Sequence, residues 1–503
     1  MAVTVFHSPS HYGYTTPPQY QFLPFHFDRR ADGTVFMANE VGEFLVLSST
    51  TFHAFTAHAL TSADPQYFDL KAKHFLSDDQ SSAHLDVLSA KYRTKKSFIE
   101  GFTKLHIFVT TLRCDQSCPY CQVSRQSQDA STNVYDMSHE VLEKSVRLML
   151  AAPALHITME FQGGEPLVNF ELIKEAVELS KVLNEGVGKV IDYVLCTNLT
   201  VLTDEHLAFC ENHNILISTS VDGPAELHDK NRPMGHESSH ALVTRNIRRC
   251  QEALGYQSVS ALMTTTRASL QHPKAIVDEY LKLDLGSLFV RELNPYGFAT
   301  KSATVIGYDT QNFLFFYRQI LDYILEINRD GHTFSESYAT MILRKILTPW
   351  PIGFVDLQSP SGAGIGVCLY NYDGDVYASD ESRMLAEVGD TTFRLGNVLE
   401  NTYEEIFFGD TMQAIAAASC NETLAGCADC AYQSYCGADP VRHYRSQLDL
   451  FGNRAVRDGF CAKNMAIIKH LLNLLIEGDT DIERVFWAWI NHESSERLRL
   501  PEV

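Results

Sequence analysis

The rhythm of apolar and polar residues changes along the chain and sets its first hundred residues apart. Between residues 20 and 48 the apolar residues fall in short runs, separated by the turn signals "DRRADG" and "NEVG". Such runs predict three β-strands. Two amphipathic stretches at 49–60 and 65–76 predict helices, and Ser and Thr open the first in a capping position. We therefore expect residues 1–100 to form a small α+β module.

From residue 104 to 295 the pattern alternates between short buried runs and amphipathic stretches. Six runs predict β-strands, at 104–112, 155–162, 190–198, 215–223, 259–265 and 287–293. Helical stretches separate consecutive runs, and this alternation favours parallel βα units. The predicted fold class is α/β, with a partial (β/α)6 barrel of the TIM type over residues 101–310. In such barrels the active site lies at the carboxyl ends of the strands.

The pattern of the remaining chain predicts helices first and then a region rich in loops. Residues 310–328 and 336–347 have helical periodicity, so 311–360 is predicted to be a helical linker. Residues 361–480 are rich in loops, contain the hairpin signal "DGDVY" and form a further predicted domain. A last helix and a tail are expected at 481–503.

Composition narrows the class of protein. The 503 residues carry 41 Lys and Arg against 62 Asp and Glu, a net charge of −21, which argues against nucleic acid as a partner. We find no run of 18 apolar residues, and the first residues lack the basic start and apolar core of a signal peptide. We therefore expect a soluble, cytoplasmic protein without a membrane partner.

The twelve cysteines fall into two clusters, at 114–121 and 427–461, and a few isolated positions. In a cytosolic chain of this size, clustered cysteines are more often metal ligands than disulfides. Cys196, Cys210 and Cys250 stand alone in apolar or helical contexts, and we predict that they are buried small hydrophobic residues.

Cys114, Cys118 and Cys121 directly follow the first predicted barrel strand, at the expected catalytic mouth. Three thiolates can hold three corners of a cubane iron–sulfur cluster and leave the fourth iron open. The alternative is a structural zinc site, which would need a fourth ligand nearby. His106 lies along a strand and His139 begins a helix, so neither is well placed for that role.

A second motif, "FQGGEP" at 161–166, lies at the end of the next strand. Gly163 and Gly164 let the backbone approach a ligand closely, and Glu165 can accept a hydrogen bond from an ammonium group. The alternative is a plain turn at the end of a strand, but two such motifs on consecutive strand ends favour a ligand site.

The Cys-x3-Cys-x2-Cys spacing followed by Gly-Gly-Glu-Pro resembles the radical S-adenosylmethionine (SAM) superfamily. The resemblance implies a [4Fe–4S] cluster whose open iron binds the amino and carboxylate groups of SAM. In that family one electron splits SAM into a 5′-deoxyadenosyl radical, which removes a hydrogen atom from an unactivated carbon. The cofactors supply this chemistry and the protein positions them.

Residues 218–224, "STSVDGP", and 228–233, "HDKNRP", resemble the peptide-modifying branch that includes anaerobic sulfatase-maturating enzymes. The resemblance implies a role at the SAM or substrate site for each matching residue. It places SAM against Tyr120, Gly163, Gly164, Glu165, Ser220, Arg232 and Leu293, and the peptide substrate near Gln162. The alternative for Ser220, Asp222 and Arg232 is a turn with a capping network.

The second cluster, "CADCAYQSYC" at 427–436 followed by Cys461, offers four thiolates. Cys427, Cys430, Cys436 and Cys461 could hold an iron–sulfur cluster or zinc. The region resembles a SPASM domain, the C-terminal extension of radical SAM enzymes that act on ribosomal peptides, which normally carries two auxiliary clusters. Serine or proline replaces cysteines of that pattern at Ser361, Ser379 and Pro440.

We therefore expect one auxiliary [4Fe–4S] cluster, and Cys368 and Cys420 as buried thiols. Asp380 aligns with the aspartate that serves the sulfatase-maturating branch as general base, although it could equally be a surface residue of the hairpin. A cluster without an open iron cannot bind SAM. It would take up the electron left on the substrate radical or relay electrons in, which points to net oxidation.

Between residues 20 and 475 the chain resembles the His-Xaa-Ser system radical SAM maturases, with signatures such as "DLKAKHFL" and "CGADPVR". The resemblance implies a ribosomal precursor with His-Xaa-Ser repeats as substrate, a second radical SAM maturase as partner and a flavodoxin- or ferredoxin-like electron donor. The N-terminal module resembles peptide-recognition modules that bind a leader peptide at a sheet edge, although it could be a structural cap. The alternatives are a formylglycine-generating sulfatase maturase and a zinc-stabilised scaffold protein.

Overall fold

The computed structural model describes residues 19–78, 82–235, 237–451 and 459–493. Its N-terminal module has a sheet of β2 (Phe25–Arg29), β3 (Val35–Asn39) and β4 (Phe44–Leu47), with antiparallel neighbours in that order. Helices α1 (Ser49–Thr56) and α2 (Pro65–Ala72) follow, so the predicted order of three strands and two helices is confirmed. Short strands β1 (Gln21–Phe22) and β5 (Leu76–Ser77) pair beside them. Alternating apolar residues give the module a core of its own.

The predicted run of six parallel strands is present. It consists of β6 (Leu105–Thr111), β9 (His156–Gly163), β10 (Val190–Cys196), β11 (Leu216–Ser220), β12 (Val259–Thr264) and β13 (Ser287–Arg291). Each strand pairs in parallel with the next one in this series. Their carboxyl ends therefore meet along one rim.

The sheet continues beyond these six strands on both sides. At one end β14 (Ser335–Glu336) pairs with β13, and at the other β15 (Val367–Tyr370) pairs in parallel with β6. The antiparallel strands β16 (Asp375–Tyr377) and β17 (Arg394–Asn397) complete a ten-stranded sheet. The sheet is open, because β6 lies against β15 and not against β13. All four residues of β15 are buried and apolar or aromatic, as expected of a strand covered on both faces.

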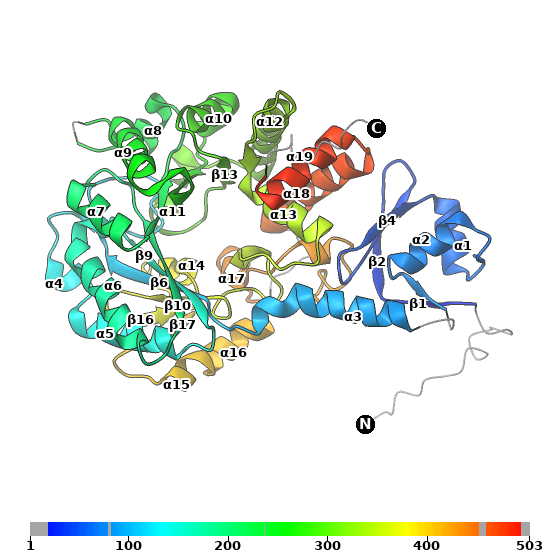
Figure 1. The fold of residues 1–503 in the computed structure, drawn as a ribbon, viewed down its shortest axis with the longest axis horizontal. Coiled ribbons are helices and arrows are strands. Elements are labelled where there is room, and N and C mark those ends of the chain that lie inside the picture. Colours follow the sequence, from blue (N-terminus) through cyan, green and yellow to red (C-terminus); the bar gives the residue numbers. More distant parts are fainter. Residues whose placement is uncertain (1–18, 79–81, 236, 452–458, 494–503) are drawn as a thin grey trace.

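Helices cover the outer face of the parallel strands (Figure 1). They are α5 (His139–Ala151), α6 (Phe170–Asn184), α7 (Asp204–Asn212), α9 (Ser239–Leu254) and α10 (Pro273–Lys282). Helix α5 shows why they lie there: Val141, Leu142, Val146 and Met149 form one apolar stripe and are all buried in the main core. Ser138 caps α5 by accepting a hydrogen bond from the backbone N–H of Val141.

The remaining elements connect or surround this sheet. They are β7 (Arg113–Cys114), β8 (Gln126–Ser127), α3 (Ala83–Lys96), α4 (Thr132–Tyr135), α8 (Ala225–Asn231), α11 (Gly297–Ile306), α12 (Thr310–Arg329), α13 (Ser337–Leu347), α14 (Asp380–Ala386), α15 (Tyr403–Phe407), α16 (Asp410–Ala417), α17 (Pro440–Gln447), α18 (Gly459–Ile476) and α19 (Thr480–Asn491). Helix α3 spans the space between the N-terminal module and the sheet (Figure 1). None of the helices in the described ranges has the length and apolar content needed to cross a bilayer.

A buried ionic triad holds the C-terminal helices to the last parallel strand. Glu292 follows β13, and its Oε1 lies 2.6 Å from Nη1 of Arg442 on α17 and 2.5 Å from Nζ of Lys463 on α18. Burial raises the pKa of Glu292, but the two cations outweigh it and lower this pKa to about 2. The triad therefore stabilises the fold above the ordinary pKa of Glu, and that contribution is lost as the pH falls towards 2.

We expect Glu292→Gln to lower the free energy of unfolding by about 3–5 kcal/mol, because two buried cations then lack a counter-charge. Denaturant unfolding at neutral pH measures the loss, which should shrink as the pH falls from 4.5 towards 2. The exposed Glu400→Gln is the matched control and should stay within about 0.5 kcal/mol. Equal stabilities of the two variants would contradict this role.

Candidate functional site

A cleft opens at the carboxyl ends of the parallel strands, with about 1040 Å³ of empty space including its open mouth. Residues from all six strand ends or the loops that follow them line it. Among them are Cys114, Cys118, Tyr120, Cys121, Gln162, Gly163, Gly164, Cys196, Ser220, Arg232, Thr264, Arg291 and Asp380. Ten of the residues predicted from the sequence thus share one cavity, although they are spread over more than 260 positions of the chain.

The three-cysteine loop wraps around the rim of this cleft after β6. The backbone N–H of Gln116 donates to Sγ of Cys114 over 3.4 Å, and Sγ of Cys118 donates to Oε1 of Gln116 over 3.6 Å. Phe298, at the start of α11, fixes the end of the loop by donating its N–H to the carbonyl of Cys121 over 2.8 Å. The three cysteines therefore line the cleft from a loop whose C-terminal end is held by α11.

Burial sets the protonation of these thiols. It raises the pKa of Cys118 to about 12, against the opposing charge of Arg232, and raises the pKa of Cys114 further still. Both groups are therefore protonated at neutral pH unless a cation binds them, because coordination to a metal deprotonates a thiol.

The Gly-Gly-Glu-Pro motif follows β9 and packs against the same loop. A Cβ at Gly163 would lie 2.2 Å from the carbonyl oxygen of Thr111, and one at Gly164 would lie 2.4 Å from that of Arg113. The glycines thus let β9 approach the start of the cysteine loop. The sequence predicts these glycines for close approach to a ligand, and the structure adds this packing requirement.

Glu165 lies behind the cleft surface, fully buried. Its Oε1 accepts from the N–H of Leu167 over 3.0 Å and from Oγ1 of Thr197 over 2.7 Å, while Oε2 accepts from the N–H of Asn198 over 2.7 Å. Burial raises its pKa to about 7, although these hydrogen bonds oppose the shift. The carboxylate joins the ends of β9 and β10, and Oε2 retains acceptor capacity for a further donor.

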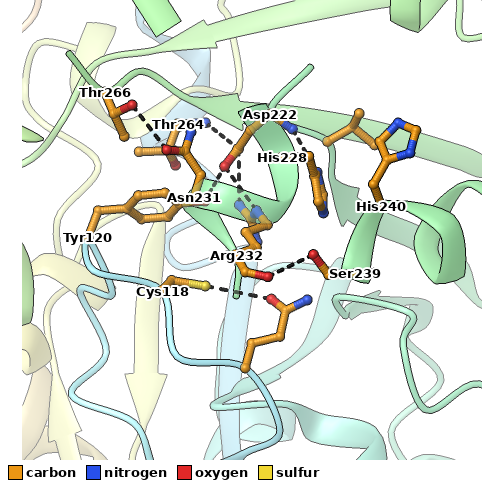
Figure 2. Close-up of polar contacts among 12 residues, drawn as sticks. Cys118, Tyr120, Asp222, His228, Asn231, Arg232, Ser239, His240, Thr264 and Thr266 are labelled. Carbon is orange, nitrogen blue, oxygen red and sulfur yellow. Dashed lines mark hydrogen bonds and ion pairs between the residues drawn. The ribbon is translucent and has the colours of Figure 1, made fainter. Parts of the chain in front are cut away.

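Figure 2 shows Tyr120, Asp222 and Arg232 in one network. The hydroxyl of Tyr120 donates to Oδ2 of Asp222 over 2.5 Å, and Nε of Arg232 donates to the same oxygen over 3.2 Å. The guanidinium of Arg232 also lies 5.4 Å from the centre of the Tyr120 ring. Asp222 accepts from the N–H of Thr264 over 3.1 Å as well. Asp222 therefore holds Arg232 in a buried network in which no side chain caps α8, and Arg232 lines the cleft from within that network.

Of the remaining residues predicted for the site, Leu293 lies outside the cleft lining and Asp380 lies within it. Leu293 is not part of the cleft lining; it packs with Cys118 against a small cluster around Tyr120. Asp380 is the first residue of α14, after the Ser379 cap, and lines the cleft. It is therefore not a surface residue of the β16 hairpin, and it shares the cleft with Gln162.

Two cleft residues, Cys196 and Arg291, and the neighbouring Glu160 were missed in the sequence or predicted otherwise. Cys196 was predicted to be a buried small hydrophobic residue, and this is wrong: it ends β10, is partly exposed and lines the cleft. Glu160 lies on β9 beside it, where Nε2 of Gln162 donates to Oε1 of Glu160 over 2.6 Å and burial raises the Glu160 pKa. Arg291 ends β13. Position at a strand end was the signal that could have found Cys196 and Arg291.

A second cavity, separate from the cleft, has about 1080 Å³ of empty space including its open mouth and is lined by Cys427, Cys430, Cys436 and Cys461. Phe27 and Asp28 of the N-terminal module form part of its wall. Nδ2 of Asn464 lies 3.7 Å from Sγ of Cys436 and can donate to it. The four cysteines predicted to act together are thus brought together from two segments of the chain.

The positions where serine or proline replaces a cysteine have structural roles. Ser379 caps α14, Pro440 is the first residue of α17, and Oγ of Ser361 accepts from the N–H of Ala363 over 3.3 Å. Cys368 is fully buried, as predicted, with Sγ 3.3 Å from Nδ1 of His106. Cys420 is partly exposed, so its predicted burial is wrong.

The donor sets have the chemistry of iron–sulfur cluster ligands, with three cysteines in the cleft and four around the second cavity. A cubane spreads its thiolates over several iron atoms, which matches cysteines that surround a cavity. The buried Nε2 of Gln116, which has no hydrogen-bond partner, adds a donor that a cluster sulfur could satisfy.

Residues 108–278 match the family model of the radical SAM superfamily. The chain is a radical SAM enzyme. The matched residues run from β6 to α10 and include the cysteine loop, the Gly-Gly-Glu-Pro motif and the Asp222 network.

Curated relatives of this radical SAM enzyme include two sulfatase-maturating enzymes. The cysteine-type anaerobic sulfatase-maturating enzyme of Clostridium perfringens (strain ATCC 13124) is 26% identical over 305 residues, 58% of this chain and 77% of that protein. The serine-type anaerobic sulfatase-maturating enzyme of Bacteroides thetaiotaomicron is 34% identical over 122 residues, 24% of this chain and 29% of that protein.

Solved structures share the fold of this radical SAM enzyme. Native anSMEcpe with bound AdoMet superposes with a TM-score of 0.61 at 20% identity, over 76% of this chain and all (100%) of that one. Streptococcus suis SuiB bound to the precursor peptide SuiA has a TM-score of 0.51 at 12% identity, over 88% of this chain and 99% of that one. The predicted α/β fold with a mainly parallel sheet is confirmed.

Proposed function

We propose that this radical SAM enzyme oxidatively modifies a ribosomally made peptide, using one SAM-binding cluster and one auxiliary cluster. One observation carries the proposal: the chain gathers three cysteines in the strand-end cleft and four more around a second cavity. A single cluster would suffice to cleave SAM. A second, fully ligated cluster is useful where an electron must leave the substrate.

Cys114, Cys118 and Cys121 would hold the first cluster, and the motif residues around them would hold SAM. When bound, these cofactors supply a 5′-deoxyadenosyl radical that takes a hydrogen atom from the substrate. The chain binds and orients them. The amino acid part of SAM would lie against Gly163, Gly164 and Ser220 of the cleft wall, with Glu165 behind them. Arg232 would offer a fixed cation to the carboxylate of SAM. The adenine would lie on the side of Tyr120, against which Leu293 packs.

Asp380 would accept the proton that leaves the substrate carbon or its neighbouring atom during oxidation. It lines the same cleft as the cysteine loop and is the first residue of α14. Gln162, on β9, would contact the peptide between Asp380 and the cofactor side of the cleft. These two residues thus define the proposed substrate end of the cavity.

Asp380→Asn tests the proposed proton acceptor. We expect product formation to fall by about 10²–10⁴-fold, because an amide cannot accept the proton. The release of 5′-deoxyadenosine should continue, since the residues around SAM are unchanged. Asp410→Asn is the matched control, because Asp410 also begins a helix but is exposed and lies outside the cleft. Mass spectrometry of the peptide and the nucleoside measures both quantities, and wild-type product formation in Asp380→Asn would exclude the role.

Cys427, Cys430, Cys436 and Cys461 would hold the auxiliary cluster, which takes up the electron from the substrate. The N-terminal module would bind the leader peptide, since β2 and β4 are the outer strands of its sheet and can accept an added strand. As supporting analogies, SuiB was solved bound to its precursor peptide, and anSMEcpe with a peptide and AdoMet.

The finer assignment follows the resemblance to the His-Xaa-Ser system maturases. The substrate would be a precursor with His-Xaa-Ser repeats, modified in concert with a second radical SAM maturase. A flavodoxin- or ferredoxin-like protein would supply electrons. Mass spectrometry of the repeat protein, produced anaerobically with and without this chain, tests the assignment. A mass change that depends on this chain and on Cys118 supports it, and an unchanged repeat protein contradicts it.

A second candidate function is the conversion of Cys or Ser to formylglycine. The identity with cysteine-type and serine-type sulfatase-maturating enzymes favours it. Ser361, Ser379 and Pro440 weigh against it, because they leave one auxiliary cluster where the resemblance implies two. Incubation with a sulfatase-motif peptide separates the two candidates. The mass loss expected for oxidation of Cys or Ser to the aldehyde would favour the formylglycine-generating function.

A further inference from the structure

We propose that Gln116 donates a hydrogen bond from its side-chain amide to the Cys118 thiolate of the loaded cluster and so raises that cluster's reduction potential. The inference rests on the proposed function, because it concerns the SAM-binding cluster. Gln116 is the middle one of the three residues between Cys114 and Cys118, and of these three it alone lines the cleft.

Gln116 contacts two of the three proposed ligands at once. Its backbone N–H donates to Sγ of Cys114 over 3.4 Å, and its side-chain Oε1 lies 3.6 Å from Sγ of Cys118. The side chain is only 3% exposed, yet its Nε2 has no hydrogen-bond partner. A buried amide that leaves two N–H groups unsatisfied is costly, by about 1–3 kcal/mol, so the structure holds an unused donor beside a ligand sulfur.

Loading of the cluster changes Cys118 from a hydrogen-bond donor to Gln116 into a hydrogen-bond acceptor. As a thiol, Cys118 donates its S–H to the amide oxygen. As a cluster ligand it is a thiolate, which has no hydrogen and can only accept. The amide oxygen would then face a negative sulfur. Half a turn about the last side-chain bond exchanges oxygen for nitrogen, which gives the sulfur a donor and the orphaned Nε2 a partner in one step.

The other groups near Cys118 do not replace this contact. Arg232 acts on Cys118 through its charge, but its guanidinium donates to the Asp222 carboxylate, and the Tyr120 hydroxyl donates to Asp222 as well. Hydrogen bonds to cluster sulfurs are among the features that set cluster potentials. A donor stabilises the reduced state more, because reduction adds negative charge to the sulfur, and it therefore raises the potential.

The test is a redox titration of the reconstituted full-length protein, followed by the paramagnetic signal that changes on addition of SAM. Gln116→Met removes the donor and keeps the volume; Gln116→Glu keeps the shape but presents only acceptors. Gln126→Met is the matched control, because Gln126 lies in the same loop on β8 and does not line the cleft. We expect the midpoint reduction potential of the cluster to become more negative in Gln116→Met and still more negative in Gln116→Glu. It should stay unchanged in Gln126→Met.

A midpoint in Gln116→Met equal to that of the wild type, at equal iron content, would overturn the proposal. If Gln116→Met does not retain its cluster, Gln116→Glu supplies the comparison, and an unshifted midpoint there overturns it equally. Failure of the proposed function is a different observation: the wild type itself would then give no signal that responds to SAM.

Discussion

Replacing Cys118 with alanine is expected to reduce 5′-deoxyadenosine formation to background. The three cysteines of the loop line one cleft, so each would hold one corner of the cluster, and Cys118 is the central one. Loss of a residue that merely supports a ligand typically costs about 10–100-fold, and loss of a ligand costs more. Liquid chromatography of anaerobic reactions with SAM and a chemical reductant measures the nucleoside directly.

Cys250→Ala is the control for this experiment. Cys250 is buried in α9 and is not part of the cleft lining, so its replacement removes a thiol outside the proposed ligand set. SAM cleavage in Cys250→Ala should equal that of the wild type at equal iron content. Persistent cleavage in Cys118→Ala would show that the loop does not hold the reactive cluster.

Replacing Cys430 with alanine is expected to separate SAM cleavage from product formation. Cys430 lines the second cavity, apart from the strand-end cleft, so the auxiliary cluster should be lost while the first is retained. Iron content should fall by about half, since each cubane holds four irons. 5′-Deoxyadenosine should still form, but the oxidised peptide should not, because the electron left on the substrate has no acceptor.

Cys420→Ala is the matched control for Cys430→Ala. Cys420 lies in the same region and is partly exposed, but it does not line the second cavity. Its replacement should leave iron content and product unchanged. A Cys430→Ala protein that makes product at the wild-type rate would contradict the proposed electron acceptor.

The six parallel strands and their helices could be predicted because each carries a local pattern. Helix α5, for example, places four buried apolar residues on one stripe, and β6 has a continuous buried run. The place of β15 could not be predicted in this way. Its pairing with β6 joins residues that are more than 250 positions apart, such as Leu105 and Val367, and no local pattern encodes such a partner.

In the candidate site, too, local motifs could be predicted from the sequence and long-range contacts could not. The cysteine spacing and the Gly-Gly-Glu-Pro motif are local, and the structure places them in one cleft. Cys196 was misjudged because a single cysteine in an apolar run looks like a core residue, and only the end of β10 reveals the side on which it lies. Gln116 carried no signal at all, since its importance lies in a contact with Cys118 and an unused amide donor.

The most direct test of the central claim is electron paramagnetic resonance of the anaerobically reconstituted, reduced protein with and without SAM. The claim is that the cleft holds a cubane with one open iron, ligated by Cys114, Cys118 and Cys121. The account predicts a brown protein with a reducible cluster signal that SAM changes in the wild type and that is missing in Cys118→Ala. A wild-type protein with zinc and no iron, or a cluster signal that SAM leaves unchanged, would contradict it.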